Sequence, residues 1–152
     1  MCFPAGTLIG AVPIELMLPN LLVPTFNLLT STIALQPVNG VFRRVATRGV
    51  RLHFVSGRTL ELTAEQRVWN VDLNAFLRAG DMGVNSVARY MSPAQRTTEP
   101  SDAVWISTAL VIPDTVTSID DVVGPNDNCY NLWTTTNRNF FASGYLVSEH
   151  LL

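Results

Sequence analysis

Short stretches of alternating apolar and polar residues, separated by turn residues, constrain the fold of this chain most strongly. Residues 50–55 alternate in this way, Ser56-Gly57-Arg58 supplies a turn, and residues 59–63 alternate again. Side chains two residues apart lie on one face of a β-strand, so this pattern predicts a β-hairpin. Further strands are predicted from β-branched and aromatic runs at residues 104–112, 129–135 and 140–147.

Turn and loop residues are expected to separate these strands. Pro113-Asp114 is predicted to end the first run, and the polar residues 136–139 are predicted to follow the second. Residues 91–102 carry two prolines and are expected to form a loop. Helical signals are short: one turn is expected at residues 73–77, ended by Ala79-Gly80, where glycine is well placed as a helix stop.

The length of 152 residues fits one domain with its own hydrophobic core. The sequence shows neither an internal repeat nor an inter-domain linker, so residues 1–152 are expected to form a single domain. Many short strands joined by irregular turns predict an all-β fold, with at most short helical turns. The sheet is expected to be barrel-like or folded over on itself, and a layered α/β fold is not expected.

Residues 16–42 contain no charged side chain. Pro19, Pro24 and Pro37 interrupt this stretch, whereas a membrane-spanning helix needs about 20 mainly apolar residues with intact backbone bonding. We therefore expect no membrane span. Two interpretations stay open for residues 16–42: an exposed apolar arm or insert that docks on other protein subunits, or a run of buried strands and turns.

Charge and cysteine content exclude several classes of site. The net charge is −2 and the ten basic residues, all arginines, are scattered, whereas nucleic-acid binding usually shows a denser basic stripe. Cys2 and Cys129 are far apart and fit neither a zinc-ligand spacing nor a disulfide framework. No nucleic acid, metal or cofactor is therefore predicted. A signal peptide is not predicted either, because no basic region precedes the first apolar stretch.

Four motifs, in the family's order along the chain, resemble those of Hint (hedgehog/intein) domains. The first is Cys2-Phe3-Pro4-Ala5-Gly6-Thr7-Leu8-Ile9 at the start, and the second is residues 59–69, which are similar to the family motif where a strand leads into a Thr-x-x-His turn. The third is Leu77-Arg78-Ala79-Gly80-Asp81, which matches the Leu-x-x-Gly-Asp turn. The fourth is residues 129–134 with 139–147, which are similar to the C-terminal motif. The segment from Gly10 to Arg48 matches least. The resemblance implies a folded-over β-horseshoe related to self-processing modules.

The resemblance also implies roles for individual residues. In this family the thiol of the first residue attacks the preceding carbonyl in an N–S acyl shift, and Cys2 holds that position. Only Met1 precedes Cys2 in this sequence, so a methionine is the acyl group expected to be transferred. Thr63 matches the Thr of the Thr-x-x-His turn, but Gln66 holds the His position. Glutamine cannot act as an acid or base near neutral pH, so a rate contribution of roughly 10²–10⁴-fold should be lost.

Splicing also needs a terminal Asn that cyclises with help from the His before it. Counted without gaps from Gly144, these positions fall on Ser148 and Glu149, so splicing is not expected. His150 lies beyond them, near the terminus. His53 lies in an alternating strand and is expected to be a half-exposed strand residue and not a catalyst.

Asn131 corresponds to the Asp of the family's C-terminal motif, which lies beside the first cysteine in the Hint fold. Cys129 would share a strand face with Asn131, and the resemblance therefore brings it close to Cys2. Two alternatives stay open. The cysteines form a disulfide if their Cα atoms approach within about 7 Å, or they are two separate, buried thiols.

Three functions are consistent with these observations. The first is a catalytically degenerate Hint-like domain that serves as a structural or adaptor subunit in a larger assembly. A charged fraction of only 14% suggests extensive burial by neighbouring subunits, as in a viral or phage particle. The alternative is a self-cleaving module that uses Cys2 for an N–S acyl shift without Asn cyclisation, with Thr63, Gln66 and Asn131 around it. The third is a free-standing binding module.

Overall fold

The described part of the chain is built almost entirely from β-strands. The computed structural model describes residues 2–92, 110–134 and 136–149, apart from the side chains of residues 47 and 123–127. The helical elements among these residues are two 3₁₀ turns, η1 (Ile14–Leu16) and η2 (Ala79–Asp81). The predicted all-β fold with at most short helical turns is therefore confirmed.

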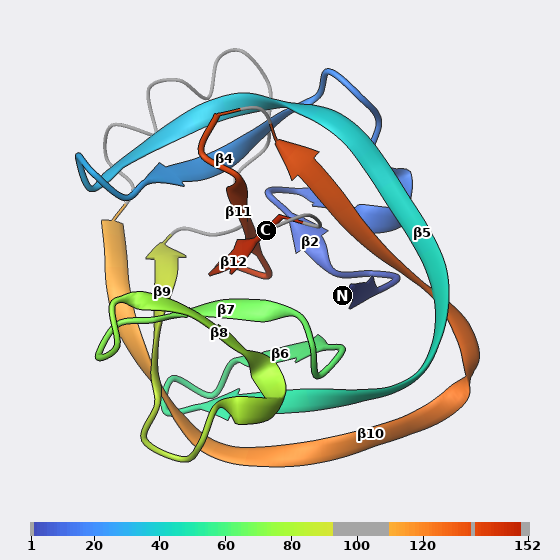
Figure 1. Cartoon of the computed structure of the whole chain (residues 1–152), viewed down its shortest axis with the longest axis vertical. Coiled ribbons are helices and arrows are strands. Elements are labelled where there is room, and N and C mark those ends of the chain that lie inside the picture. The colour runs from blue at the N-terminus through green and yellow to red at the C-terminus, as the bar shows by residue number, and fades with distance from the viewer. Residues whose placement is uncertain (1, 93–109, 135, 150–152) are drawn as a thin grey trace.

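Two long strands curve around the rim of the molecule (Figure 1). They are β5 (Thr32–Phe54) and β10 (Leu110–Thr134), and they pair antiparallel from Phe54 with Val116 to Val38 with Thr134. Three register shifts interrupt this pairing. Such irregularities bend a strand pair, so the ribbon can close around the centre. These two strands are longer than any strand that the sequence predicts.

The rim strands are long because each pairs with several partners in turn. β5 pairs with β4 (Leu22–Asn27) at its start and with β6 (Thr59–Leu62) at its end. The first residues of β10 pair with β9 (Val87–Ser92), and its residues Cys129 and Tyr130 pair with β1 (Phe3–Pro4). The partners supply backbone hydrogen bonds along the whole rim.

The remaining strands fill and close the ring. They are β2 (Leu8–Ile9), β3 (Val12–Pro13), β7 (Arg67–Asn70), β8 (Ala75–Arg78), β11 (Asn139–Ala142) and β12 (Tyr145–Ser148). β12 pairs with β11, β7 and β9. Figure 1 shows β11, β12 and the N-terminal strand inside the ring made by β5 and β10. The first and last described strands are therefore central.

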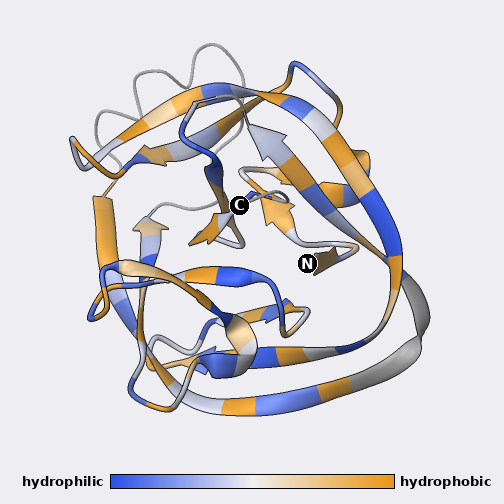
Figure 2. Ribbon diagram, in the orientation of Figure 1, coloured by the Kyte–Doolittle hydropathy of each residue, from blue (hydrophilic) through white to orange (hydrophobic). Residues whose placement is uncertain are grey.

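Aromatic side chains fill the centre. Phe3 from the first strand packs edge-on against Phe140, with ring centroids 5.9 Å apart. Tyr145 stacks on Phe54 of the rim at 4.1 Å. A second, smaller cluster consists of Phe26, Trp69, Met91, Phe141 and Leu146. Apolar and polar segments alternate along parts of β5 and β10 in Figure 2, as expected for strands with one buried face.

The structure confirms the hairpin at residues 50–63 and corrects the helical turn at residues 73–77. Residues 73 and 74 belong to a turn, strand β8 runs from Ala75 to Arg78, and the helical turn lies at Ala79–Asp81. The cause is a tight turn before β8. The Asn70 side chain accepts a hydrogen bond from the Leu73 amide at 3.0 Å, and Asn74 has a φ of 51°, which a right-handed helix excludes.

Two predicted strand boundaries are also wrong. The single strand expected at residues 140–147 is a hairpin, because Ser143 and Gly144 both have positive φ values, 48° and 89°, and reverse the chain. Pro113-Asp114 does not end a strand, since β10 runs through both residues and Pro113 pairs with Arg89 of β9. The polar break predicted at residues 136–139 is confirmed for residues 136–138, whereas Asn139 already belongs to β11. Most of the loop predicted at residues 91–102 and of the strand predicted at residues 104–112 falls within residues 93–109, which lie outside the described residues.

Residues 16–42 combine features of both interpretations. Val23, Phe26 and Val38 are buried, and β4 forms a hairpin with the start of β5. The Asn139 side chain binds both the amide and the carbonyl of Phe26, at 2.8 and 2.9 Å. The segment is therefore anchored to the domain. Leu29 at the hairpin tip, however, is 97% exposed.

Candidate functional site

The candidate site is centred on Cys2, which is fully buried inside the ring. Its amide donates a hydrogen bond to Thr63 Oγ1 at 3.0 Å, and its carbonyl accepts one from the Thr63 amide at 2.9 Å. Thr63 follows β6, so the end of the 50–63 hairpin fixes the N-terminal strand. The structure thus brings together the first two residues that the motifs single out.

Gln66 lies in the same turn and has no exposed surface. Its Nε2 donates to the Ser148 carbonyl at 3.0 Å and to the Arg67 carbonyl and Ser148 Oγ at 3.3 Å each. Its Oε1 accepts from Asn131 Nδ2 at 2.7 Å. Both ends of the Gln66 amide are therefore engaged, and they join the middle of the chain to β10 and β12.

A second turn supports the Thr63–Gln66 turn from outside. The Ala79 amide donates to the Gln66 carbonyl at 2.8 Å, and the Gly80 amide donates to the Ala64 carbonyl at 2.9 Å. Gly80 allows this approach, since a Cβ there would lie 3.2 Å from the Ala64 Cβ. The Leu77–Asp81 motif of the sequence is thus a brace for the site.

Ser148 and Glu149 lie next to this network. Glu149 is buried, and its Oε2 accepts a hydrogen bond from the Thr134 amide at 3.0 Å. Its Oε1 pairs with Arg138 Nε at 2.8 Å. The carboxylate therefore fastens the end of β12 to the turn before β11. Sequence reasoning noted the loss of Asn at this position but did not foresee this structural role.

Cys2 and Cys129 form a disulfide, with their Cα atoms 5.4 Å apart. Of the two alternatives left open by the sequence, the structure has the disulfide. Pro4 pairs with Cys129 and Phe3 with Tyr130, so the next position of the N-terminal chain, Cys2, faces Asn131. The disulfide is thus a diagonal bridge between the first strand and β10.

Arg44 lies beside the disulfide, and Glu65 follows the turn that holds Cys2. Arg44 is the register partner of Cys129 across the β5–β10 ribbon. Glu65 follows the Thr63 turn, and a hydrogen bond from its own backbone amide lowers its pKa; the Thr63 hydroxyl and the Arg44 charge act in the same direction. Glu65 is therefore a carboxylate at neutral pH and has no proton to donate there.

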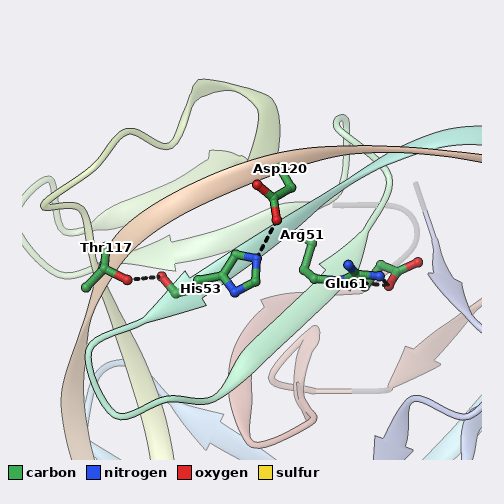
Figure 3. Close-up of polar contacts among 5 residues, drawn as sticks. All are labelled: Arg51, His53, Glu61, Thr117 and Asp120. Carbon is green, nitrogen blue, oxygen red and sulfur yellow. Dashed lines mark hydrogen bonds and ion pairs between the residues drawn. The ribbon is translucent and has the colours of Figure 1, made fainter.

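His53 lies on the sheet formed by β6, β5 and β10, in a different polar group (Figure 3). Its Nε2 contacts Asp120 Oδ2 at 2.7 Å, and Arg51 pairs with Glu61 at 2.9 Å on the neighbouring strand. Thr117 Oγ1 donates to the His53 carbonyl at 3.3 Å. The imidazole is part of a partly exposed cross-strand pair, as expected for a half-exposed strand residue. His150 lies outside the described residues.

A buried carboxylate, Asp114, was missed by sequence reasoning. Its Oδ2 accepts hydrogen bonds from Ser56 Oγ at 2.5 Å and from the Tyr145 hydroxyl at 2.8 Å. Burial is the main cause that raises the pKa of Tyr145, and the adjacent carboxylate adds to it. The three residues join the 50–63 hairpin to β12. The signal in the sequence is a lone Asp within a β-branched run, and the Pro113-Asp114 pair there instead predicts a strand end.

The described residues around Cys2 hold its amide and carbonyl in place. The sulfur is held in the disulfide, Gln66 is neutral, and Glu65 is ionised. The described residues contain no cluster of three His, Cys, Asp or Glu side chains suited to a metal ion. Within the same residues, the structure has no helix long and apolar enough to span a membrane.

Comparisons with solved structures identify the fold. The crystal structure of a DnaB intein from Synechocystis sp. PCC 6803 superposes with a TM-score of 0.75, covers 99% of both chains and is 18% identical. The intein-like domain from Clostridium thermocellum gives a TM-score of 0.76 at 18% identity, over 97% of this chain and 98% of that one. A transcription factor IIB mini-intein gives 0.68 at 17% identity and covers 84% of this chain.

Comparisons of sequence alone find no relative. No protein-family model matches the chain, and no curated protein matches it. The three solved structures described above are 17–18% identical to this chain, so they identify the fold and not the activity. The chain has the Hint/intein-like fold that its four motifs predict.

Proposed function

We propose that this chain, which has the fold of the inteins, is a catalytically degenerate Hint/intein-like domain that acts as a structural or adaptor subunit in a larger assembly. One observation carries the first part of this proposal. At the position where the family places its catalytic histidine, Gln66 is buried and bonded to Asn131 and Ser148. The site has become a structural junction.

The physical argument concerns proton transfer. The acyl shift and its resolution require a group that protonates the leaving amide nitrogen, and a neutral carboxamide does not do this near pH 7. A positioned acid or base contributes typically 10²–10⁴-fold to a rate. Replacing Gln66 would in addition cost stability, because the buried Asn131 Nδ2 and Ser148 carbonyl would lose their hydrogen bonds to it. The arrangement therefore favours stability and disfavours catalysis.

Two further features support this proposal. The Cys2 sulfur is joined to Cys129, and a sulfur in a disulfide cannot attack a carbonyl as a thiolate. Glu149 holds the position of the cyclising Asn and is engaged with Arg138 and the Thr134 amide. A carboxylate lacks the amide nitrogen that succinimide formation requires.

The test is a fusion in which a reporter domain precedes Cys2, incubated with a dithiol reductant and followed by intact mass. We expect an uncut fusion, even though reduction frees the Cys2 thiol. The matched variants are Gln66→His, which returns an imidazole to the turn, and Cys2→Ala, which removes the nucleophile. Reporter release by the unmodified domain, abolished in Cys2→Ala, would refute the degenerate assignment.

The second part of the proposal concerns assembly with other protein subunits through residues 16–42. Leu16, Leu18 and Leu29 are 64, 63 and 97% exposed in a stretch without any charge. Leu29 lies at the tip of the anchored hairpin, and Leu16 and Leu18 lie before its first strand. Exposed leucines are suited to an apolar contact with a neighbouring protein, as between subunits of a viral or phage particle. Native mass spectrometry of the chain from its natural source is expected to find it in a larger complex; a monomer alone would contradict this part.

A self-cleaving module is the second candidate function. The observation that favours it is the Cys2 amide, which is the scissile nitrogen of such a reaction and is held by Thr63 Oγ1 at 3.0 Å. Under this alternative, reduction of the disulfide is followed by slow thioester formation. Hydroxylamine cleaves thioesters and spares amides, so hydroxylamine-dependent release from the reduced fusion separates the two functions.

A further inference from the structure

The two cysteines of the disulfide differ slightly in exposure. Cys2 has no exposed surface, and Phe3 and Asn131 beside it have none either. Cys129 retains 5% exposure and follows Asn128, which is exposed. Thiol–disulfide exchange begins where an incoming thiolate can reach a sulfur, so Cys129 is the more open side of the bridge for an attack from solvent.

A positive charge lies beside Cys129. Arg44 is exposed and faces Cys129 directly across the ribbon, so both side chains lie on the same sheet face. The Arg44 charge also helps to lower the pKa of the Glu65 carboxylate. An anion that approaches Cys129 from solvent therefore meets the Arg44 guanidinium.

We infer that the Cys2–Cys129 disulfide is a thiol-exchange site that small acidic thiols enter at Cys129, with Arg44 binding a carboxylate of the incoming thiol. The thiolate of the acidic thiol attacks the Cys129 sulfur and forms a mixed disulfide there. The bond between the two cysteine sulfurs breaks, and its electron pair leaves with Cys2 as a thiolate, which takes a proton from water. The product is a Cys129 adduct with a free Cys2 thiol.

The freed Cys2 thiol stays in its place after exchange. Its amide and carbonyl remain bonded to Thr63, and Phe3 next to it is buried against Phe140. The N-terminal strand is thus held by contacts that exchange does not break. The expectation that the freed Cys2 thiol does not cleave the chain rests on the proposed function, because Gln66 offers no proton. The formation of the Cys129 adduct does not depend on the proposed function.

The experiment uses glutathione as the acidic thiol and cysteamine as a cationic one, at equal thiolate concentrations and low salt. Peptide masses identify which cysteine carries the adduct, and the rate of its appearance is compared between the two thiols. We expect the adduct on Cys129, with glutathione favoured about three- to tenfold, as expected for a charge interaction across several ångströms near a protein surface. This preference should shrink in high salt.

Three single variants test the role of the charges. Arg44→Gln is expected to remove the preference for glutathione. Arg43→Gln is the matched control, because Arg43 is exposed but pairs with Tyr130 and lies on the opposite face. Glu65→Gln is expected to raise the preference, since it frees Arg44 from a competing carboxylate.

Several outcomes would overturn the inference. They are an adduct that forms first on Cys2, equal rates for glutathione and cysteamine, a preference that survives in Arg44→Gln, or exchange only after the domain is unfolded in denaturant. Reporter release after exchange would overturn the degenerate assignment and leave the exchange site standing. The two proposals therefore fail in distinguishable ways.

Discussion

Removal of the disulfide is the perturbation whose magnitude the structure defines best. Cys2 and Cys129 are 127 residues apart, so the bridge links the first strand to the far end of the chain. The double variant Cys2→Ala, Cys129→Ala removes the bridge and leaves no unpaired thiol. Both alanines fit the buried positions, because each side chain becomes smaller.

The expected cost follows from chain entropy. A bridge that closes a loop of this length removes about 16 cal/mol/K from the unfolded ensemble, or about 5 kcal/mol at 25 °C. Domains of this size are stable by roughly 5–15 kcal/mol. The double variant is therefore expected to fold, with a large part of its stability lost.

Urea unfolding followed by tryptophan fluorescence measures this cost. With a slope of about 2 kcal/mol per molar urea, the midpoint should fall by about 2–3 M relative to the oxidised wild-type chain. Wild-type protein in a dithiol reductant is the control and should resemble the double variant. A loss below about 1 kcal/mol, in a sample with the disulfide proven by mass, would contradict a chain-entropy contribution of this size.

Four other substitutions test three separate parts of the structure. Tyr145 has a raised pKa in the folded state, so the stability of the wild-type chain should decrease above about pH 10 by up to about 1.4 kcal/mol per pH unit. Tyr145→Phe should lack this decrease in urea unfolding between about pH 8 and 11. The same loss of stability with pH in this variant would contradict a raised pKa of Tyr145. A Cβ at Gly49 would lie 2.6 Å from the Leu62 carbonyl oxygen, so Gly49→Ala should lower the unfolding free energy by about 1–3 kcal/mol, and a neutral effect in thermal unfolding would count against the β5–β6 contact. Glu149→Gln keeps an acceptor for the Thr134 amide but loses the charge opposite the half-exposed Arg138, so the unfolding free energy should fall by about 1 kcal/mol. Arg138→Gln should lower it by a similar amount. If the two losses add in the double variant, the two side chains do not stabilise each other as a pair.

Local patterns predicted much of the fold. The 50–63 hairpin followed from alternation and a Ser-Gly turn, and the four motifs predicted the Hint-like fold. The hairpin at residues 139–148 was missed because every residue of β11 and β12 is buried, so no alternation marks the turn at Ser143. The lengths of β5 and β10 depend on successive partners, which a local pattern does not contain.

The site was predicted less completely than the fold. Thr63 and Gln66 were identified by motif position, and the structure places them beside Cys2 and Ser148. The Cys2–Cys129 bridge could not be derived from spacing, because it depends on the register of a two-residue strand against β10. Asp114 was missed because its partner hydroxyl on Tyr145 is 31 residues away.

The intact mass of a reporter fused before Cys2, under reducing conditions, distinguishes a degenerate domain from a self-cleaving one. The fusion is expected to keep its full mass through long incubation, because Gln66 supplies no proton for the acyl shift at Cys2. Release of the reporter at Cys2, absent in Cys2→Ala, would show an active self-cleaving module and exclude a degenerate one.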